Sequence, residues 1–418
     1  MHRGLRQQRD RISLYFLFGL FVLLPLTVVF GHKGVAPWLL LASLPAFARG
    51  DFWQSAFGQL FDQPDLRNPF FFGFASIIAF CMWIFLSGFW SPRGQPSLAF
   101  YVLAPVIVGG SVVWFSLHLS RLWSYRLSYA YAISITAGMA VLLFEGMSGG
   151  LLRSLLPPDD PSPERSKDII ALGRGVTALA PALFPAAIIV SLIWNRYVSL
   201  GLLLLGVAAA FSNDVTANAV AISAGLVAGM IAFKAPRRTI MFTGWTVIVL
   251  LLLAPLAALL PVEAIFQSAG DGLPSSWLHR VAIWQSVAAK IPGGLPFGYG
   301  ADFARAWQET APLINVPGAG APLELMPTHP HNIFLQIWLE LGLPGVLTFT
   351  AFVYCGMKVL KDANPPAAVL AAIVGAIAAI AVSMAVEGSL WQVWRLAAMA
   401  LAGMGAALAY SLQQNWSR

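Results

Sequence analysis

The amino-acid sequence predicts an all-α, polytopic membrane protein with about 12 transmembrane helices, folded as a single transmembrane domain over residues 1–418. The 418 residues are 58% hydrophobic and only 10% charged, with a mean hydropathy of +0.74. A soluble chain would carry about 25% charged residues. The apolar residues gather in runs of roughly the 20 residues that a bilayer-spanning helix needs. These observations exclude an ordinary soluble enzyme, a disordered scaffold and a secreted domain stapled by disulfides.

Twelve apolar runs are candidates for these helices. The second run is short, and the seventh directly follows the sixth, so the number of spans is approximate. The runs cover residues 12–29, 36–47, 69–88, 98–119, 127–144, 176–194, 197–211, 215–233, 240–260, 332–356, 367–386 and 390–412.

The basic residues indicate which side of the membrane each loop faces. Arg3, Arg6, Arg9 and Arg11 precede the first run, and no cleavage site of a removed signal peptide follows it. With the amino terminus in the cytoplasm, alternation places 15 of the 25 Lys and Arg residues on the cytoplasmic side, as the positive-inside rule favours. Segments 146–167 and 261–330 then face the opposite side. This membrane pattern and anionic headgroups explain the net charge of +7, so we expect no nucleic-acid partner.

Segment 261–330 is the longest hydrophilic stretch, and we expect it to contain short helices. Ser275 and Ser276 are good N-caps for a helix that runs to Ile291. Arg280 would emerge beside two tryptophans of the helix's apolar stripe. An interfacial amphipathic helix with a snorkelling arginine has the same pattern, so that interpretation stays open. The stripe consists of Trp277, Val281, Trp284, Ala288 and Ile291.

A glycine-rich stretch follows, at residues 292–300. Gly298 and Gly300 allow sharp turns in which the backbone presents bare N–H groups. Such nests bind phosphate oxygens, although a purely structural turn is the more common case in this context.

The end of the segment carries the densest polar signal, with His329, His331 and Asn332 directly before an apolar run. These side chains lie where a helix N-terminus favours anions, and ionisable groups at membrane positions tend to be functional. Capping and an interfacial position are the alternative. No third ligand lies at zincin-like spacing, and Cys81 and Cys355 lie in apolar runs, so we expect no metal site and no disulfide.

Asn332, Gln336 and Glu340 recur every four residues and form one polar line on an otherwise apolar helix. This line must face protein or water, because each group would cost several kcal/mol in lipid. Arg395 lies at a comparable depth in the last run, so we expect a structural ion pair between Glu340 and Arg395. The Gly-Leu-Pro-Gly stretch at 342–345 should bend the helix.

Two more charged residues fall on the same side. Arg174 stands at the start of the sixth run, and Asp214 stands before the eighth. Two or three arginines, two histidines and a glycine nest at one membrane face suit a diphosphate, which arginine binds through its bidentate fork.

Several of these motifs resemble the O-antigen ligase and polymerase family of bacterial envelope glycosyltransferases. The run from His329 to Asn332, followed by Gln336 and by Glu340 through Gly345, is similar to the family's signature. The elements around Arg280, residues 296–300 and Arg174 also resemble family elements. The resemblance covers residues 174–345, whereas the first five helices match only in being hydrophobic. Many members carry an arginine where this chain has Asn213-Asp214, so this chain lacks that arginine.

The resemblance implies an integral-membrane glycosyltransferase of the C type in the bacterial inner membrane, with its active site facing the periplasm. Such an enzyme moves an undecaprenyl-diphosphate-linked O-polysaccharide to a hydroxyl of the lipid A core and needs no cofactor. Displacement in line would invert the anomeric carbon. Arg174, Arg280 and His331 would be catalytic, the arginines on the leaving group and the histidine on the acceptor proton. The expected substrate-binding residues are His329, Asn332, Trp284, Gly298, Gly300 and Asp214.

Other functions remain possible from the sequence alone. A polymerase would use a growing glycan as acceptor, and a protein glycosylase would use a protein hydroxyl. A transporter for lipid-linked sugar would place its charges near the bilayer midplane, whereas here the cations gather at one face. These considerations favour a ligase.

Overall fold

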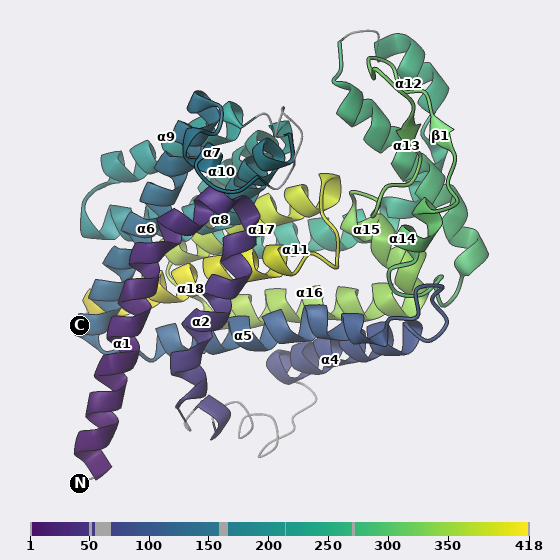
Figure 1. Ribbon diagram of the computed structural model, residues 1–418. Coiled ribbons are helices and arrows are strands. Elements are labelled where there is room, and N and C mark those ends of the chain that lie inside the picture. Colours follow the sequence, from purple (N-terminus) through teal and green to yellow (C-terminus); the bar gives the residue numbers. More distant parts are fainter. Residues whose placement is uncertain are drawn as a thin grey trace.

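The structure, a computed structural model, describes residues 2–49, 52–54, 68–158, 166–213, 215–269 and 272–416. It is almost entirely helical, which confirms the predicted all-α membrane fold (Figure 1). The first half contains α1 (His2–Thr27), η1 (Val28–Gly34), α2 (Val35–Phe47), α4 (Pro69–Ser87), η2 (Pro96–Leu98), α5 (Ala99–Leu117), α6 (Arg121–Ser148), α7 (Leu151–Ser154), α8 (Ser166–Ile193) and α9 (Arg196–Ser212).

The second half begins with two long helices and ends with three. Between them lie short elements of the segment 261–330. The elements are α10 (Thr216–Lys234), α11 (Pro236–Leu253), η3 (Ala254–Leu259), α12 (Val262–Ala269), α13 (Ser275–Lys290), η4 (Ile291–Gly294), α14 (Phe303–Gln308), β1 (Leu313–Ile314), β2 (Leu323–Glu324), α15 (Ile333–Gln336), the π-helical turn η5 (Ile337–Leu341), α16 (Gly342–Ala363), α17 (Ala367–Val386) and α18 (Val393–Trp416).

Ten helical stretches in the described part of the chain are long and apolar enough to cross a membrane, fewer than the expected 12 or so. The first two predicted spans form one continuous stretch, Arg11–Phe47, and the predicted seventh span, Arg196–Ser212, is shorter than the rest. The first stretch kinks at Gly31, whose φ is 64°. A Cβ there would lie 2.0 Å from the Ala171 carbonyl oxygen, so glycine permits the turn η1, between α1 and α2, to pack closely against α8.

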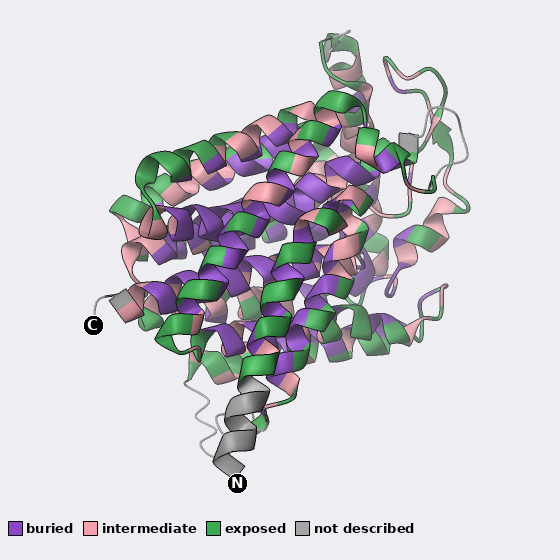
Figure 2. Cartoon of the chain, turned by 60° about the vertical axis from the view of Figure 1, so that its left-hand side comes forward, coloured by how far each residue is buried: buried purple, intermediate pink, exposed green. Residues whose placement is uncertain are grey.

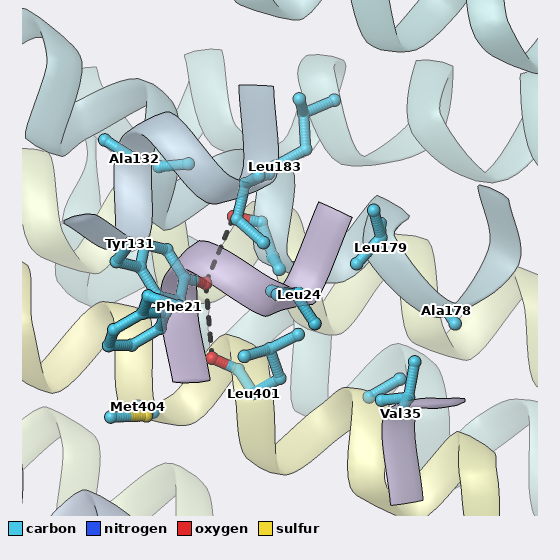
Figure 3. Packing of buried hydrophobic residues seen from close by; sticks show 14 of the residues in the cluster. Phe21, Leu24, Val35, Tyr131, Ala132, Ala178, Leu179, Leu183, Leu401 and Met404 are labelled. Carbon is cyan, nitrogen blue, oxygen red and sulfur yellow. Dashed lines mark hydrogen bonds between the residues drawn. The ribbon is translucent and has the colours of Figure 1, made fainter. Parts of the chain in front are cut away.

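Helix α8 is central to the bundle and contacts α6, α9, α17 and α18. Its apolar face, with Leu179 and Leu183, joins the largest core cluster. Tyr131 of α6 lies within this cluster and donates from its hydroxyl to the carbonyls of Ala182 (3.3 Å) and Leu401 (3.2 Å) (Figure 3). Buried residues lie between the helices, and exposed ones follow the outward faces (Figure 2). Those outward faces carry large apolar side chains, as contact with lipid requires.

Helices α12, α13 and α14 and the β1–β2 hairpin gather at one end of the bundle (Figure 1). Helix α13 begins at Ser275, but Pro274 occupies the capping position and no side chain caps the helix, so the expected serine caps are wrong. The buried face is also shifted from the predicted stripe, because the helix packs mainly against η3 and also against α15 and η5. This leaves Trp277, Arg280 and Trp284 half-buried on the adjoining face. The buried residues are Leu278, Ala282, Ile283, Val287 and Ala288.

The polar line on α15 and η5 faces protein, as predicted, because Gln336 and Glu340 are both fully buried. The bend expected after Glu340 is also present. The backbone turns sharply at Gly342, which has φ 59° and ψ −154°, and α16 continues from there. This broken helix brings the segment before α15 to the end of the bundle where α13 and α14 lie.

Candidate functional site

Residues from three separate helices surround the loop before α15. His331 lies in this loop, and its pKa is lowered to about 3, first by burial and then by the positive charges of Arg280, His279, Arg174 and Arg395. These charges come from α13, α8 and α18. The fold therefore brings together the two arginines and the histidine predicted to be catalytic, although they lie far apart in the sequence.

The two loop histidines contact each other directly. Their ring centroids lie 4.3 Å apart, and the backbone N–H of His331 donates to Nδ1 of His329 at 3.1 Å. His331 has φ 54°, a left-handed conformation that is uncommon for a residue other than glycine. Its Nδ1 is buried and has no hydrogen-bond partner among the described residues. The Nδ1 atom of His329 is thus engaged in a hydrogen bond, whereas Nδ1 of His331 has none within the described ranges.

Both predicted catalytic arginines lack an ion-pair partner. Within the described ranges, neither Arg174 nor Arg280 makes a side-chain hydrogen bond or a salt bridge, and both are half-buried. The guanidinium of Arg280 lies over the Trp277 ring, with Cζ 5.5 Å from the centroid. Burial lowers the pKa of Arg280, and the nearby charge of Glu387 partly offsets that effect. Two cations that are partly desolvated and unpaired form a favourable site for a multivalent anion.

Trp284 and Asn332 were predicted to bind substrate. The indole N–H of Trp284 is buried without a partner in the described structure, so it remains a free donor. The Oδ1 atom of Asn332 instead caps α15 by accepting from the N–H groups of Phe334 (2.9 Å) and Leu335 (3.2 Å). That is the capping role considered above for this residue. Asp214, also predicted to bind substrate, lies outside the described residues.

The glycine-rich stretch does not present bare N–H groups at its predicted binding positions, so the expected nest is wrong. The N–H of Gly298 donates to Gly294 at 2.7 Å, and that of Gly300 donates to the Glu340 carbonyl at 2.9 Å. A Cβ on Gly298 would lie 2.4 Å from the same carbonyl oxygen, and one on Gly300 would lie 2.7 Å from Cα of Ser91. These glycines allow the loop to dock closely on η5 and α4.

The expected ion pair between Glu340 and Arg395 is also wrong. Glu340 accepts hydrogen bonds from the backbone N–H groups of Asp302 and Ala304 and from the side chains of Gln336 and Trp391. Its carboxylate therefore faces the loop before α14, whereas Arg395 faces the end of α17. Both residues are buried within networks of side chains and backbone groups, and their structural role remains a prediction.

Arg395 pairs instead with Glu387, the residue after α17, at 3.3 Å. It also donates to Ser383 Oγ (2.6 Å) and to Gln392 Oε1 (2.5 Å). Sequence reasoning missed this α17–α18 junction because only a few polar residues separate the last two apolar runs. The run from Glu387 to Gln392 was the available signal.

Groups of three or more His, Cys, Asp or Glu residues that could hold a metal ion do not occur in the part of the chain that the structure describes. His279, the third histidine of the segment, lies with Nε2 2.7 Å from the Glu324 carbonyl oxygen. This contact ties α13 to β2.

Comparison with known proteins agrees with the site's location. A family model described as O-antigen ligase matches residues 200–350. This part of the chain is thus similar to the O-antigen ligase family. This segment includes Arg280, His329 and His331, whereas Arg174 and Arg395 lie outside it.

Related proteins match a shorter stretch of about 85 residues. A "Putative polysaccharide ligase" of Rickettsia prowazekii is 42% identical over 85 residues, and its counterpart in Rickettsia typhi is 41% identical over 85 residues. A similarly named protein of Rickettsia felis is 39% identical over 87 residues. The matched region spans 20% of the length of each of these relatives and 20–21% of this chain. The chain is thus similar, over this short stretch, to proteins that are named as polysaccharide ligases.

Proposed function

We propose that this protein is an O-antigen ligase of the bacterial inner membrane. It transfers an undecaprenyl-diphosphate-linked O-polysaccharide to a hydroxyl of the lipid A core at the periplasmic face. The observation that carries this proposal is the convergence of two unpaired guanidiniums and one uncommitted imidazole at one end of the bundle. The family match over residues 200–350 supports the same class of reaction.

The arginines bind the donor's diphosphate in this proposal. The guanidiniums of Arg174 and Arg280 come from different helices, α8 and α13, so they can contact the diphosphate from two directions. Each can form a two-pronged, charge-assisted contact with phosphate oxygens. Negative charge grows on the leaving diphosphate as the glycosidic bond breaks, and fixed cations stabilise that charge without reorganising.

His331 accepts the proton of the acceptor. The hydroxyl oxygen forms a new bond to the anomeric carbon of the donor sugar, and the bond from that carbon to the diphosphate oxygen breaks. The bonding electrons leave with the lipid diphosphate, and the hydroxyl proton passes to a ring nitrogen of His331. Attack opposite the leaving group inverts the anomeric carbon. No metal or nucleotide takes part in this scheme, as the family resemblance implies.

The electrostatics couple the two substrates. Burial and the neighbouring cations lower the pKa of His331 to about 3, and such a group is a weak base. A bound diphosphate brings negative charges that oppose those of Arg280 and Arg174, so it raises this pKa. His331 then becomes an effective base only when the donor is in place.

Reconstitution tests the reaction. Purified protein in liposomes would receive undecaprenyl-diphosphate glycan and lipid A core, and the products would be separated by mass. A ligase attaches glycan to the core. Lengthening of the glycan on its lipid carrier would show a polymerase, and the absence of any new glycosidic bond would contradict both.

Labelling tests the membrane orientation. A cysteine placed at Gln308 in α14 should react with an impermeant maleimide in intact spheroplasts, because this segment is proposed to be periplasmic. The native Cys81 and Cys355 are buried and serve as the background. Labelling only after lysis would contradict the proposed face of the reaction.

A further inference from the structure

The break between η5 and α16 leaves backbone groups without helical partners inside a membrane-spanning stretch. Residues Ile333–Ala363 form one of the stretches that are long and apolar enough to cross a membrane, yet their backbone turns sharply at Gly342. An unpaired N–H or carbonyl is costly in lipid, so a broken helix is tolerated only where other groups supply the partners. The groups that pair with this break therefore lie at membrane depth as well.

The partners come from the glycine-rich loop after α13 and from α4. The backbone of the loop bonds to both sides of the break. These hydrogen bonds join the Leu343 N–H to the Pro296 carbonyl (2.8 Å), the Tyr299 N–H to the Leu339 carbonyl (2.9 Å) and the Gly300 N–H to the Glu340 carbonyl (2.9 Å). The Trp83 indole N–H of α4 donates to the Leu341 carbonyl at 2.7 Å. The loop and α4 thus pair the carbonyls and the N–H group at the break.

Contacts with α4 give the depth of the loop's tip. Phe297 lies beside Trp83, with the ring centroids 6.0 Å apart. Trp83 precedes Ser87, the last residue of α4, by four residues, or roughly 6 Å at 1.5 Å per residue. Helix α4 runs alongside α16 (Figure 1) and is itself long and apolar enough to span a bilayer. Phe297 therefore lies level with the last turn of a membrane span.

The tip of the loop presents an apolar surface. Phe297 is 57% exposed and Leu295 is 44% exposed, and residues 291–300 include no charged side chain. The surface continues onto α16, where Leu343 and, one turn later, Leu347 are exposed. Exposed apolar side chains that gather on one surface mark a site of interaction. Here they form one surface with the outward side chains of a span.

Two aromatic residues just after α4 mark the membrane boundary. Trp90 donates from its indole N–H to the Gly298 carbonyl at 3.2 Å, and its ring centroid lies 5.4 Å from that of Trp83. Phe89, beside it in the sequence, is exposed. Tryptophans gather at the interface between membrane and water. With Trp90 at this boundary, the loop crosses it near Gly298 and its tip lies on the lipid side.

We propose that residues 292–297 form a re-entrant loop whose side chains Leu295 and Phe297 insert into the acyl layer of the bilayer. The partner is the lipid of the leaflet on that side, because the exposed surface is apolar, uncharged and continuous with the lipid-facing side of α16. Segment 261–330 is then not wholly outside the membrane, and the C-terminal end of α13 is anchored to the bilayer. The proposal does not depend on the transfer reaction, since it requires only that the spans cross a bilayer.

Collision measurements on spin-labelled protein test the insertion. Cys81 and Cys355 are buried and would be replaced by alanine, and one nitroxide would be attached at Phe297→Cys or Leu295→Cys in protein held in nanodiscs. Both labels should collide more often with oxygen, which concentrates among acyl chains, than with a water-soluble nickel chelate. Their depth should be roughly 5–10 Å below the headgroup boundary, as for other interfacial segments.

The controls are labels at two further exposed leucines. Leu347→Cys, on the lipid-facing side of α16, should give the same preference for oxygen. Leu313 belongs to the same outer segment as the loop and is 64% exposed, close to the value for Phe297, but it pairs in register with Glu324 of β2. The Leu313→Cys label should meet the nickel chelate instead. All of these changes are at exposed side chains, which cost little stability, so the variants should fold.

Two results would overturn the proposal. Loop labels that meet the nickel chelate as often as the Leu313→Cys label would place the loop in water. Loop labels that neither reagent reaches would show that protein, such as a second copy of this chain, covers the loop.

Thermal unfolding tests the same insertion without a label. Phe297→Asp places a carboxylate among acyl chains, so it should lower the Tm in nanodiscs by about 2–6 °C. Phe297→Asn loses the same contact with Trp83 but adds no charge, so it should lower the Tm less. Leu313→Asp should leave the Tm within about 1 °C of wild type. Equal shifts for Phe297→Asp and Leu313→Asp would contradict the insertion.

Discussion

Arg395 and Arg280 lie near the same carboxylate, that of Glu387, but only one of them is bonded to it. Arg395 pairs with Glu387 and donates to Ser383 and Gln392, so its guanidinium is engaged on every side. The charge of Glu387 raises the pKa of Arg280, but Arg280 makes no hydrogen bond or salt bridge within the described residues. Burying a polar group without a partner costs free energy.

The same contrast between paired and unpaired polar groups separates the region around Arg395 from the region around Arg280. At the α17–α18 junction and along η5, almost every buried polar side chain is paired. At the entrance of α8 and along α13, the guanidiniums of Arg174 and Arg280, Nδ1 of His331 and the indole N–H of Trp284 are left open. We infer that the paired region builds the site and that the unpaired region binds the substrate.

The largest expected effect is on turnover, through the unpaired histidine. His331→Asn removes the ring but suits the left-handed backbone, which asparagine tolerates. The transfer rate should fall by on the order of 10²–10⁴, the usual contribution of a positioned general base, with donor binding largely retained. Single-turnover assays and donor titration would measure the two separately. Transfer at the wild-type rate, or a loss of donor binding as large as that of the arginine variants, would rule out His331 as the base.

A second prediction addresses the paired region. Glu340→Gln keeps the shape but sets an NH₂ group against donors, so it should destabilise the protein by about 1–3 kcal/mol. Glu309→Gln is the control, since its carboxylate is exposed and pairs with Arg93, and it should cost less than about 1 kcal/mol. Thermal unfolding in detergent would compare them. If the Glu340→Gln protein is fully stable but inactive, Glu340 takes part in the reaction and its role is not structural.

The smallest expected effect is a pH dependence of stability. The pKa of His331 is lowered to about 3, whereas an unfolded histidine titrates near 6.5. Between these values the unfolded chain binds a proton that the folded chain does not. Stability is therefore complete above about pH 6.5 and is lost as the pH falls through this window. Melting temperatures from pH 7.5 to 5 should fall less steeply for His331→Asn than for wild type, and identical slopes would contradict the assignment.

The sequence could predict the elements of the fold and the residue types of the site. Runs of apolar residues predict helices directly, and the polar line from Asn332 to Glu340 could only face protein. Arg174 and His331 stood out because ionisable residues at the ends of apolar runs are costly unless they are used. Arg280 stood out because it lies beside the two tryptophans of an apolar stripe.

The sequence could not predict which polar groups pair with each other. Glu340 and Arg395 lie at similar depths, but depth along a helix does not give the direction that a side chain faces. The bonds of Glu340 to the loop before α14 depend on the docking of Gly298 and Gly300 against η5. Such contacts depend on tertiary packing between segments that are distant in the sequence, and a linear pattern does not encode them.

The most direct test of the contrast is the binding of undecaprenyl diphosphate to purified protein. Arg174→Gln and Arg280→Gln should each weaken binding about 10- to 100-fold, because each removes a charge-assisted contact with phosphate. Lysine at either site should restore binding only in part, since it lacks the fork. The control is Arg196→Gln, whose arginine contacts only Tyr197 among the described residues. If the two glutamine variants bind the lipid diphosphate as tightly as this control, the unpaired guanidiniums are not the donor site.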